Sequence, residues 1–178
     1  MKSRTETSIL FTATAIASTD KLTFYRELND QLAALLSGET DPIANAANTS
    51  ALVFEMVRGL NWAGFYFLHT PDELLLGPFQ GRPACVRIAT GRGVCGTAVA
   101  RRQSIVVNDV NAFAGHIACD SASRSELVVP LFRDGVVFGV LDLDSASPAR
   151  FDDEDRVGVE SLAATYVAAS VWKQDEHR

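Results

Sequence analysis

The sequence predicts an α+β fold, and three observations indicate it. Amphipathic helix patterns lie toward both ends of the chain, short runs typical of strands lie between them, and the dipeptide Asp134-Gly135 separates two of those runs. Helices that bracket consecutive hairpins are typical of a domain built on a mostly antiparallel sheet. No repeat, low-complexity tract or linker interrupts the pattern, so we expect one domain over residues 19–178 after an N-terminal extension, residues 1–18, that is loosely ordered.

The first part of the chain is expected to be helical. Residues 21–36 place apolar side chains three and four positions apart, with Ser18, Thr19 or Asp20 as possible caps and Gly38 as a stop. The side chains expected to face the core are Leu22, Tyr25, Leu28, Leu32, Leu35 and Leu36. Asp41 followed by Pro42 is an N-cap and first-turn pair, which predicts a second helix that continues toward Gly59.

Strand patterns follow the second helix. Residues 62–68 and 73–79 are rich in aromatic and aliphatic side chains and indicate a hairpin around Pro71-Asp72. Residues 86–88 and 104–107 are further short strands, and the stretch GRGVCGTAVARR between them is expected to hold a short helix. Residues 127–132 and 136–143 flank Asp134-Gly135, a strong signal for a two-residue hairpin turn.

A helix over residues 151–172 is expected to close the chain. It would be capped near Asp152, and the acidic run at residues 152–156 fits a helix start, where acids complement the macrodipole. The side chains expected to point inward are Val157, Leu162, Ala163, Tyr166, Val167 and Val171.

Composition excludes several classes of partner. The chain has 178 residues, of which 47% are hydrophobic, enough to bury a core without a metal or a disulfide. The 22 acids exceed the 16 Lys and Arg, and a net charge of -6 repels phosphate backbones, so no nucleic acid is expected. No apolar run approaches the roughly 20 residues that cross a bilayer, so no membrane is expected either.

The start of the chain imitates a secretory signal only loosely. Glu6 lies in the segment that should be basic, and several threonines dilute the apolar part. The three cysteines are an odd number, which fits a secreted protein poorly because one thiol would be left over. A reducing, cytoplasmic location is therefore expected.

The three cysteines are the first candidates for chemistry. Cys85, Cys95 and Cys119 each lie where a strand pattern gives way to Gly, Pro or polar residues. They can be small buried hydrophobes, or they can form a redox set in which one thiolate attacks and another resolves the oxidised product as a disulfide. Spacing along the chain leaves both interpretations open, because bridging depends on proximity in the fold.

Charged residues near Cys119 add two further interpretations. His116 could lower the pKa of Cys119 or simply close the loop with a hydrogen bond. Arg124 would ordinarily pair with Asp120 or Glu126. No metal is expected, since the cysteines and His116 lack CxxC or HxxxH spacing.

The second candidate group is acidic. Glu126 stands just before a strand, and Asp142 and Asp144 alternate in GVLDLDS, so the two aspartates face the same side of a strand. The group is a solvated sheet face, a guard on an edge strand, or a pocket that holds a cation or supplies a proton. Trp62 and Tyr66 also differ by an even step, so they either line that face or pack in the core.

Several longer motifs, in order, resemble one family. The segments NWAGFY (61–66), LGPFQGRPACVRI (76–88), GRGVCGTA (91–98), GHIACDSASRSELVVPL (115–131) and GVLDLDS (139–145) together closely resemble the free methionine-(R)-sulfoxide reductases, which are built on a GAF domain. The likeness covers roughly residues 21–170. Ala114 stands where we would expect proline, which bears on the rigidity of that loop and not on the chemistry.

The resemblance implies a fold and a set of roles. It implies a central antiparallel sheet with the N- and C-terminal helices packed on one face, where relatives form homodimers, and active-site loops over the other face. Cys119 would attack, Cys85 would resolve and Cys95 would be an auxiliary thiol. The residues expected to bind substrate and assist proton transfer are Glu126, Asp142 and Asp144, with Trp62 and Tyr66 as pocket walls.

The reaction implied is reduction of free L-methionine-(R)-sulfoxide to methionine. Cys119 would become a sulfenic acid, Cys85 would condense with it to a disulfide, and thioredoxin would reduce that disulfide, with no bound cofactor. Two other readings stay open: a non-catalytic GAF sensor of a small ligand, and a protein-interaction module with incidental cysteines. The order in which Cys85 and Cys95 act, and the acid that donates the proton, are also left open.

Overall fold

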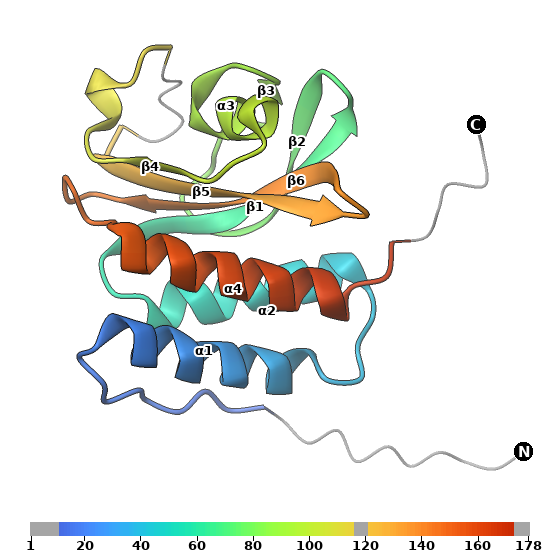
Figure 1. The fold of residues 1–178 in the computed structure, drawn as a ribbon, viewed down its shortest axis with the longest axis vertical. Coiled ribbons are helices and arrows are strands. Elements are labelled where there is room, and N and C mark those ends of the chain that lie inside the picture. The colour runs from blue at the N-terminus through green and yellow to red at the C-terminus, as the bar shows by residue number, and fades with distance from the viewer. Residues whose placement is uncertain (1–10, 116–120, 173–178) are drawn as a thin grey trace, which may run out of the picture.

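The computed structural model describes residues 11–115 and 121–172 (Figure 1). Within these residues one sheet has the strand order β3-β2-β1-β6-β5-β4, and every neighbouring pair is antiparallel. The strands are β1 (Leu60–Thr70), β2 (Glu73–Gly81), β3 (Arg87–Ala89), β4 (Ile105–Val107), β5 (Ser125–Arg133) and β6 (Val136–Ser145). The helices are α1 (Lys21–Leu36), α2 (Pro42–Met56), α3 (Gly93–Arg101) and α4 (Asp153–Ala169), with a 3-10 turn at Val110–Ala112.

The helices divide unequally between the two faces of the sheet. Figure 1 shows α2 and α4 against one face, with α1 lying across their outer side, and α3 with β3 over the other face. Each face has its own apolar cluster. The larger is built on Phe65, Leu141 and Tyr166, and the smaller on Trp62, Val128 and Val140. The expected α+β arrangement, with the terminal helices together on one face, is confirmed.

Local signals in the sequence set most element boundaries. The Asp20 carboxylate accepts a hydrogen bond from the Thr23 amide at the start of α1, and Asp41 caps α2 directly before Pro42. Asp134 and Gly135 have φ of 49° and 74°, the left-handed conformation that a tight hairpin turn between twisted strands requires. The predicted helices and hairpins are therefore confirmed, with β1 and β2 longer than the patterns indicated.

Three residues expected in the core are exposed, which corrects the predicted helix faces. Leu22 is 52% exposed because the first turn of α1 directs Lys21 toward Asp155 instead. Val157 is 43% exposed, since α4 turns Gly158 onto the ring of Tyr25, where an added Cβ would lie 2.1 Å from Cγ. Val171 is 60% exposed because α4 ends at Ala169 and not at residue 172.

The segment before α1 lies along that helix. The backbone of Thr14 exchanges two hydrogen bonds with the side chain of Gln31, of 2.8 and 2.9 Å, and Phe11 and Ile16 pack against the larger cluster. Across the described part of the chain, no helix combines the length and the apolar character needed to cross a membrane.

Candidate active site

Strand register brings the predicted acids and aromatic residues onto one face of the sheet. Asp144 on β6 lies opposite Glu126 on β5 and opposite Trp62 on β1, which forms one row across three strands. Asp142 lies in the next row, opposite Gly64. Because side chains alternate along a strand, all of these residues face α3 and not α2 or α4. Trp62 and Tyr66 therefore lie on the face of the acids and are also buried in the smaller apolar cluster, so both interpretations left open by the sequence apply.

Helix α3 places the thiol of Cys95 beside Asp142 and Glu126. Cys95 is 4% exposed, and its Sγ lies 3.2 Å from Asp142 Oδ2 and 4.0 Å from Glu126 Oε1. The close approach of α3 depends on Gly96, since a Cβ there would lie 2.2 Å from the carbonyl oxygen of Ala89. The interpretation of Cys95 as a small buried residue is thus correct as to burial, but its surroundings are polar.

The acids are buried together, which changes their protonation. Glu126 and Asp142 are 6% and 5% exposed. Desolvation raises the pKa of Glu126 well above its ordinary range, and Asp142 and Asp144 add like-charge repulsion. Burial likewise raises the pKa of Asp142 to about 7, against hydrogen bonds from Cys95 and Glu126 that oppose the rise. The Glu126–Asp142 pair therefore holds a proton near neutral pH.

The same burial holds the Cys95 thiol in its protonated form. Desolvation, followed by the charges of Asp142 and Glu126, raises the pKa of Cys95 far above its ordinary value. The thiol is thus a hydrogen-bond donor to Asp142 and not a nucleophilic thiolate. Among the described residues the second carboxylate oxygen of Asp142, Oδ1, is buried without a hydrogen-bond partner, so the site offers an acceptor to a ligand.

An aromatic wall stands beside the acids. The Trp62 ring stacks on Tyr66 at 5.9 Å between centroids and on Phe79 at 5.3 Å. The missing side chain of Gly64 makes room for this wall, because a Cβ there would lie 2.7 Å from the Trp62 ring and 2.3 Å from Phe79 Cβ. The sequence analysis missed Phe79 and Gly64; only the pairing of β1 with β2 reveals that they belong to the wall.

The wall contacts the segment that carries Cys85. The Trp62 indole donates to the carbonyl oxygen of Arg82 at 3.1 Å, and the Tyr66 hydroxyl donates to that of Cys85 at 2.9 Å. Cys85 is half-buried and disulfide-bonded, whereas Cys95 is a free thiol.

Cys119 and His116 lie outside the described residues, as does Asp120. Arg124 is exposed, and its backbone donates to Ser145 at 2.7 Å.

One group of described residues could hold a metal ion. The Cys95 sulfur and one oxygen from each of Glu126 and Asp142 lie within 4.8 Å of one another. This donor set differs from the cysteine and histidine set weighed in the sequence, and it coincides with the residues expected to bind substrate. A thiol donor with a raised pKa opposes metal ligation, because the metal binds the thiolate.

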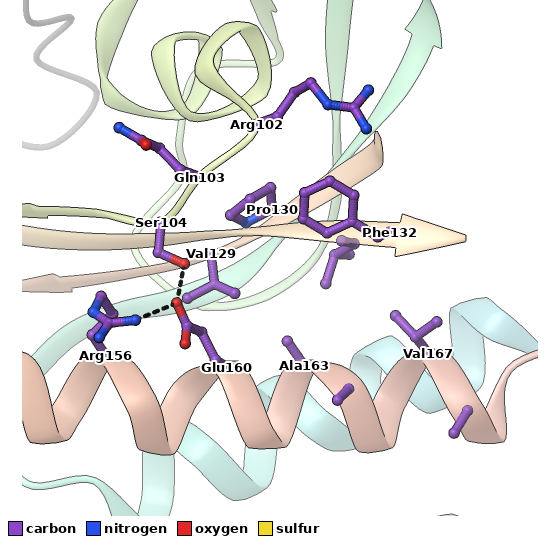
Figure 2. Close-up of a pocket in the computed structure, with 13 residues that line it drawn as sticks. Arg102, Gln103, Ser104, Val129, Pro130, Phe132, Arg156, Glu160, Ala163 and Val167 are labelled. Atoms are coloured by element: carbon purple, nitrogen blue, oxygen red, sulfur yellow. Dashed lines mark hydrogen bonds and ion pairs between the residues drawn. The ribbon is translucent and has the colours of Figure 1, made fainter. Parts of the chain in front are cut away.

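A separate cavity of about 770 Å³ lies between α4 and β5 and contains none of the predicted site residues. Figure 2 shows Glu160 at its wall, joined to Arg156 at 2.8 Å and to Ser104 at 2.7 Å. Its remaining walls are mostly small or apolar side chains such as Ala163, Val129 and Val167. Without a thiol or an unpaired acid, it is not the candidate site.

The chain is similar in sequence to GAF-domain proteins and to two reductases. The GAF domain family profile matches residues 44–169. The free methionine-R-sulfoxide reductase of Escherichia coli (strain K12) is 55% identical over 145 residues, which cover 82% of this chain and 87% of that protein. The reductase of the same name from Saccharomyces cerevisiae is 41% identical over 78% of this chain and 81% of its own length.

The chain is also similar in three dimensions to a solved structure. The X-ray structure of free methionine-R-sulfoxide reductase from Neisseria meningitidis, in complex with its substrate, superposes with a TM-score of 0.85 at 48% identity. The superposition covers 90% of this chain and 95% of that one.

Proposed function

The chain belongs to the free methionine-R-sulfoxide reductases, a family of GAF-domain proteins, and from this premise we propose that it reduces free L-methionine-(R)-sulfoxide to L-methionine by thiol chemistry. The observation that carries the proposal is the buried Glu126–Asp142 pair, which holds a proton beside an aromatic wall. Such a site can protonate an oxygen and receive an apolar thioether at the same time.

In the first step the Cys119 thiolate attacks the sulfur of the sulfoxide. The sulfoxide oxygen would leave as a very basic oxide, so a carboxyl of the Glu126–Asp142 pair donates the proton it needs. The protonated oxygen then passes from the substrate sulfur to the Cys119 sulfur while the bond between the two sulfurs breaks, so Cys119 becomes a sulfenic acid and methionine leaves with its sulfur reduced. Atoms and electrons balance, because Cys119 is oxidised by the two electrons that methionine gains.

In the second step the Cys85 thiol condenses with the sulfenic acid. The sulfur of Cys85 bonds to that of Cys119, and the hydroxyl leaves as water with the thiol proton. The chain holds three cysteines, of which Cys85 is disulfide-bonded and Cys95 is free. These observations support Cys85 as the resolving partner of Cys119 and Cys95 as a group that donates a hydrogen bond to Asp142. A dithiol protein, thioredoxin, then reduces the disulfide.

Selection for the free amino acid follows from its ammonium group. A peptide-bound methionine lacks that cation, whereas Asp142 has a buried acceptor oxygen without a partner and Asp144 lies half-buried two residues away. An ammonium that donates to these carboxylates would relieve the cost of burying them. A peptide would leave the buried Oδ1 of Asp142 without a donor and would be rejected.

The alternative is a GAF sensor that binds a small ligand without turnover. Its phosphate-bearing ligands would meet the buried acids Glu126 and Asp142 and be repelled. The disulfide of Cys85 has no part in that alternative.

The test is NADPH consumption in the presence of thioredoxin and its reductase, with free L-methionine-(R)-sulfoxide, the S epimer and a peptide-bound sulfoxide as separate substrates. We expect turnover with the free R form alone, and the same turnover in EDTA, since no bound metal or other cofactor takes part. The reductase proposal would be overturned if the folded, reduced protein turned over none of the three.

We also propose a cellular location and an oligomeric state for the protein. A cycle that ends in reduction by thioredoxin requires a reducing compartment, so a cytoplasmic location fits it. A homodimer is proposed from the family resemblance, and light scattering in solution measures it.

A further inference from the structure

The segment that carries Cys85 joins β2 to β3 and contains neither helix nor strand. Residues 82–86 include Pro83, and Arg82 and Val86 at the two ends are exposed. A segment of this kind does not fix the direction of a side chain by itself, because its backbone has no regular hydrogen-bond partners. Whatever holds Cys85 in place must come from the surrounding elements.

Three carbonyl groups of this segment are held by donors of the sheet. The Leu76 amide on β2 donates to Val86 at 2.9 Å. The other two donors are side chains of the aromatic wall: the Trp62 indole on Arg82, at 3.1 Å, and the Tyr66 hydroxyl on Cys85 itself, at 2.9 Å. The aromatic wall and the backbone of Cys85 are therefore connected by hydrogen bonds.

Tyr66 is well placed to make a rigid contact. Its side chain is 2% exposed, its ring stacks on Trp62, and its hydroxyl proton is directed at the Cys85 carbonyl. A hydrogen bond with a buried donor is held more firmly than an exposed one, and breaking it removes the Tyr66 donor from the carbonyl of the half-buried Cys85.

We propose that Tyr66 is a positioning residue for the resolving thiol, whose hydroxyl holds the Cys85 backbone so that the Cys85 sulfur meets oxidised Cys119. The inference rests on the proposed function and deepens it. In the step concerned, the Cys85 sulfur bonds to the sulfenic sulfur of Cys119, the S–O bond breaks, and hydroxide and the thiol proton leave as water. Tyr66 supplies no proton or electron to this step; it fixes where the sulfur stands.

The inference separates the two halves of the cycle. Methionine has already left when Cys85 acts, so loss of the Tyr66 hydroxyl should slow disulfide closure while the aromatic ring still stacks on Trp62. Loss of one such hydrogen bond corresponds to about a five- to ten-fold change in rate. We therefore expect disulfide closure to slow by about this factor, and kcat to fall where closure limits it.

The experiment compares Tyr66→Phe with the wild type and with Tyr166→Phe. The control is matched, because the Tyr166 hydroxyl donates to the carbonyl of Pro42 at 3.1 Å, on the helix-covered face of the sheet. Reduced protein is oxidised with one equivalent of substrate, quenched by thiol alkylation at set times, and analysed by mass spectrometry. Dimedone added in parallel traps the sulfenic acid of Cys119.

The expected result is specific to one step. Tyr66→Phe should close the disulfide about five- to ten-fold more slowly than the wild type and accumulate the dimedone adduct of Cys119. Tyr166→Phe should close it at the wild-type rate. Equal closure rates in Tyr66→Phe and the wild type would overturn the inference, as would equal slowing in both variants.

Two additions keep the test decisive. Hydrogen peroxide also converts a thiol to a sulfenic acid with release of water, so the closure rate can be measured without any methionine sulfoxide. A failure of the substrate assignment then leaves the test of Tyr66 intact. If Tyr66→Phe does not fold, Trp62→Phe removes the donor at Arg82, at the other end of the same segment, and should slow closure as well.

Discussion

Replacement of Gly96 by alanine tests whether the approach of helix α3 builds the site. The added Cβ would stand 2.2 Å from the carbonyl oxygen of Ala89 and 3.1 Å from the amide of Gly91. Both contacts are backbone atoms, so no side chain can rotate away. The helix must retreat by about 1 Å before the methyl group fits without overlap.

A retreat of that size breaks the polar contacts of Cys95. Its Sγ lies 3.2 Å from Asp142, and a shift of about 1 Å takes the pair beyond hydrogen-bond range. Overpacking of this kind destabilises by about 1–3 kcal/mol. A displacement of about 1 Å in an active site lowers catalysis by about 100-fold, so we expect kcat/KM to fall far more than a loss of stability explains.

The assay pairs urea unfolding with sulfoxide reduction below the unfolding midpoint. Ala100→Gly is the control, since Ala100 is exposed on the same helix and its loss costs up to about 1 kcal/mol through helix propensity alone. That variant should keep wild-type kcat/KM. A folded Gly96→Ala protein with wild-type kcat/KM would refute the reasoning that close contact of α3 with the acids is required.

Three further predictions concern the thiols, the buried acid and the fold. Cys119→Ser should abolish turnover, whereas Cys85→Ser should release about one methionine per site and then stall as a sulfenic acid. Quenched-flow and dimedone labelling measure both outcomes. A fully active Cys119→Ser protein would contradict the assignment of Cys119 as the attacking thiol. Asp142 holds a proton in the folded state up to about pH 7 but loses it near pH 3.8 when unfolded, so its contribution to stability falls as pH rises between those values. Urea titrations should therefore show a shallower fall in Asp142→Asn, and parallel curves would contradict the raised pKa. Asp155→Ala removes a buried carboxylate that accepts hydrogen bonds from Tyr25, Lys21 and Arg150; we expect a loss of about 3 kcal/mol in unfolding free energy, and a loss below about 1 kcal/mol would show that the pairs are worth little.

The sequence predicted most of the fold because local signals agreed with it. Asp41-Pro42 and Asp134-Gly135 each fix a boundary by backbone chemistry that no tertiary contact has to supply. The prediction that Leu22 and Val157 are buried was wrong because no local signal sets which side of a helix faces the core. Their spacing suits a buried face, but the orientation of a helix is set by its partners, here Lys21 against Asp155 and Gly158 against Tyr25.

The sequence indicated which residues belong to the site, but it did not indicate which of them lie close together in the fold. Alternation placed Asp142 and Asp144 on one face, but strand order alone joins that face to Glu126 and Trp62. The depth at which Cys95 lies, and its hydrogen bond to Asp142, depend on how closely α3 approaches the sheet. The spacing of apolar residues along the chain gives no information on the distance between α3 and the sheet.

The division of the sheet into two faces explains how one small domain tolerates such a site. The face covered by α2 and α4 holds the larger apolar cluster, including fully buried Phe65, Leu141 and Tyr166, and most of the hydrophobic stabilisation arises there. The opposite face buries Glu126 and Asp142, which destabilise the fold in proportion to their desolvation. Because both faces share the strands β1, β5 and β6, the apolar face holds the backbone of the acids rigid. Their burial is therefore compensated by a bound proton, and a cationic ligand would stabilise them in the same way. A buried acidic pair on a sheet held in this way suits the proposed substrate, which would bring a positive charge and accept a proton.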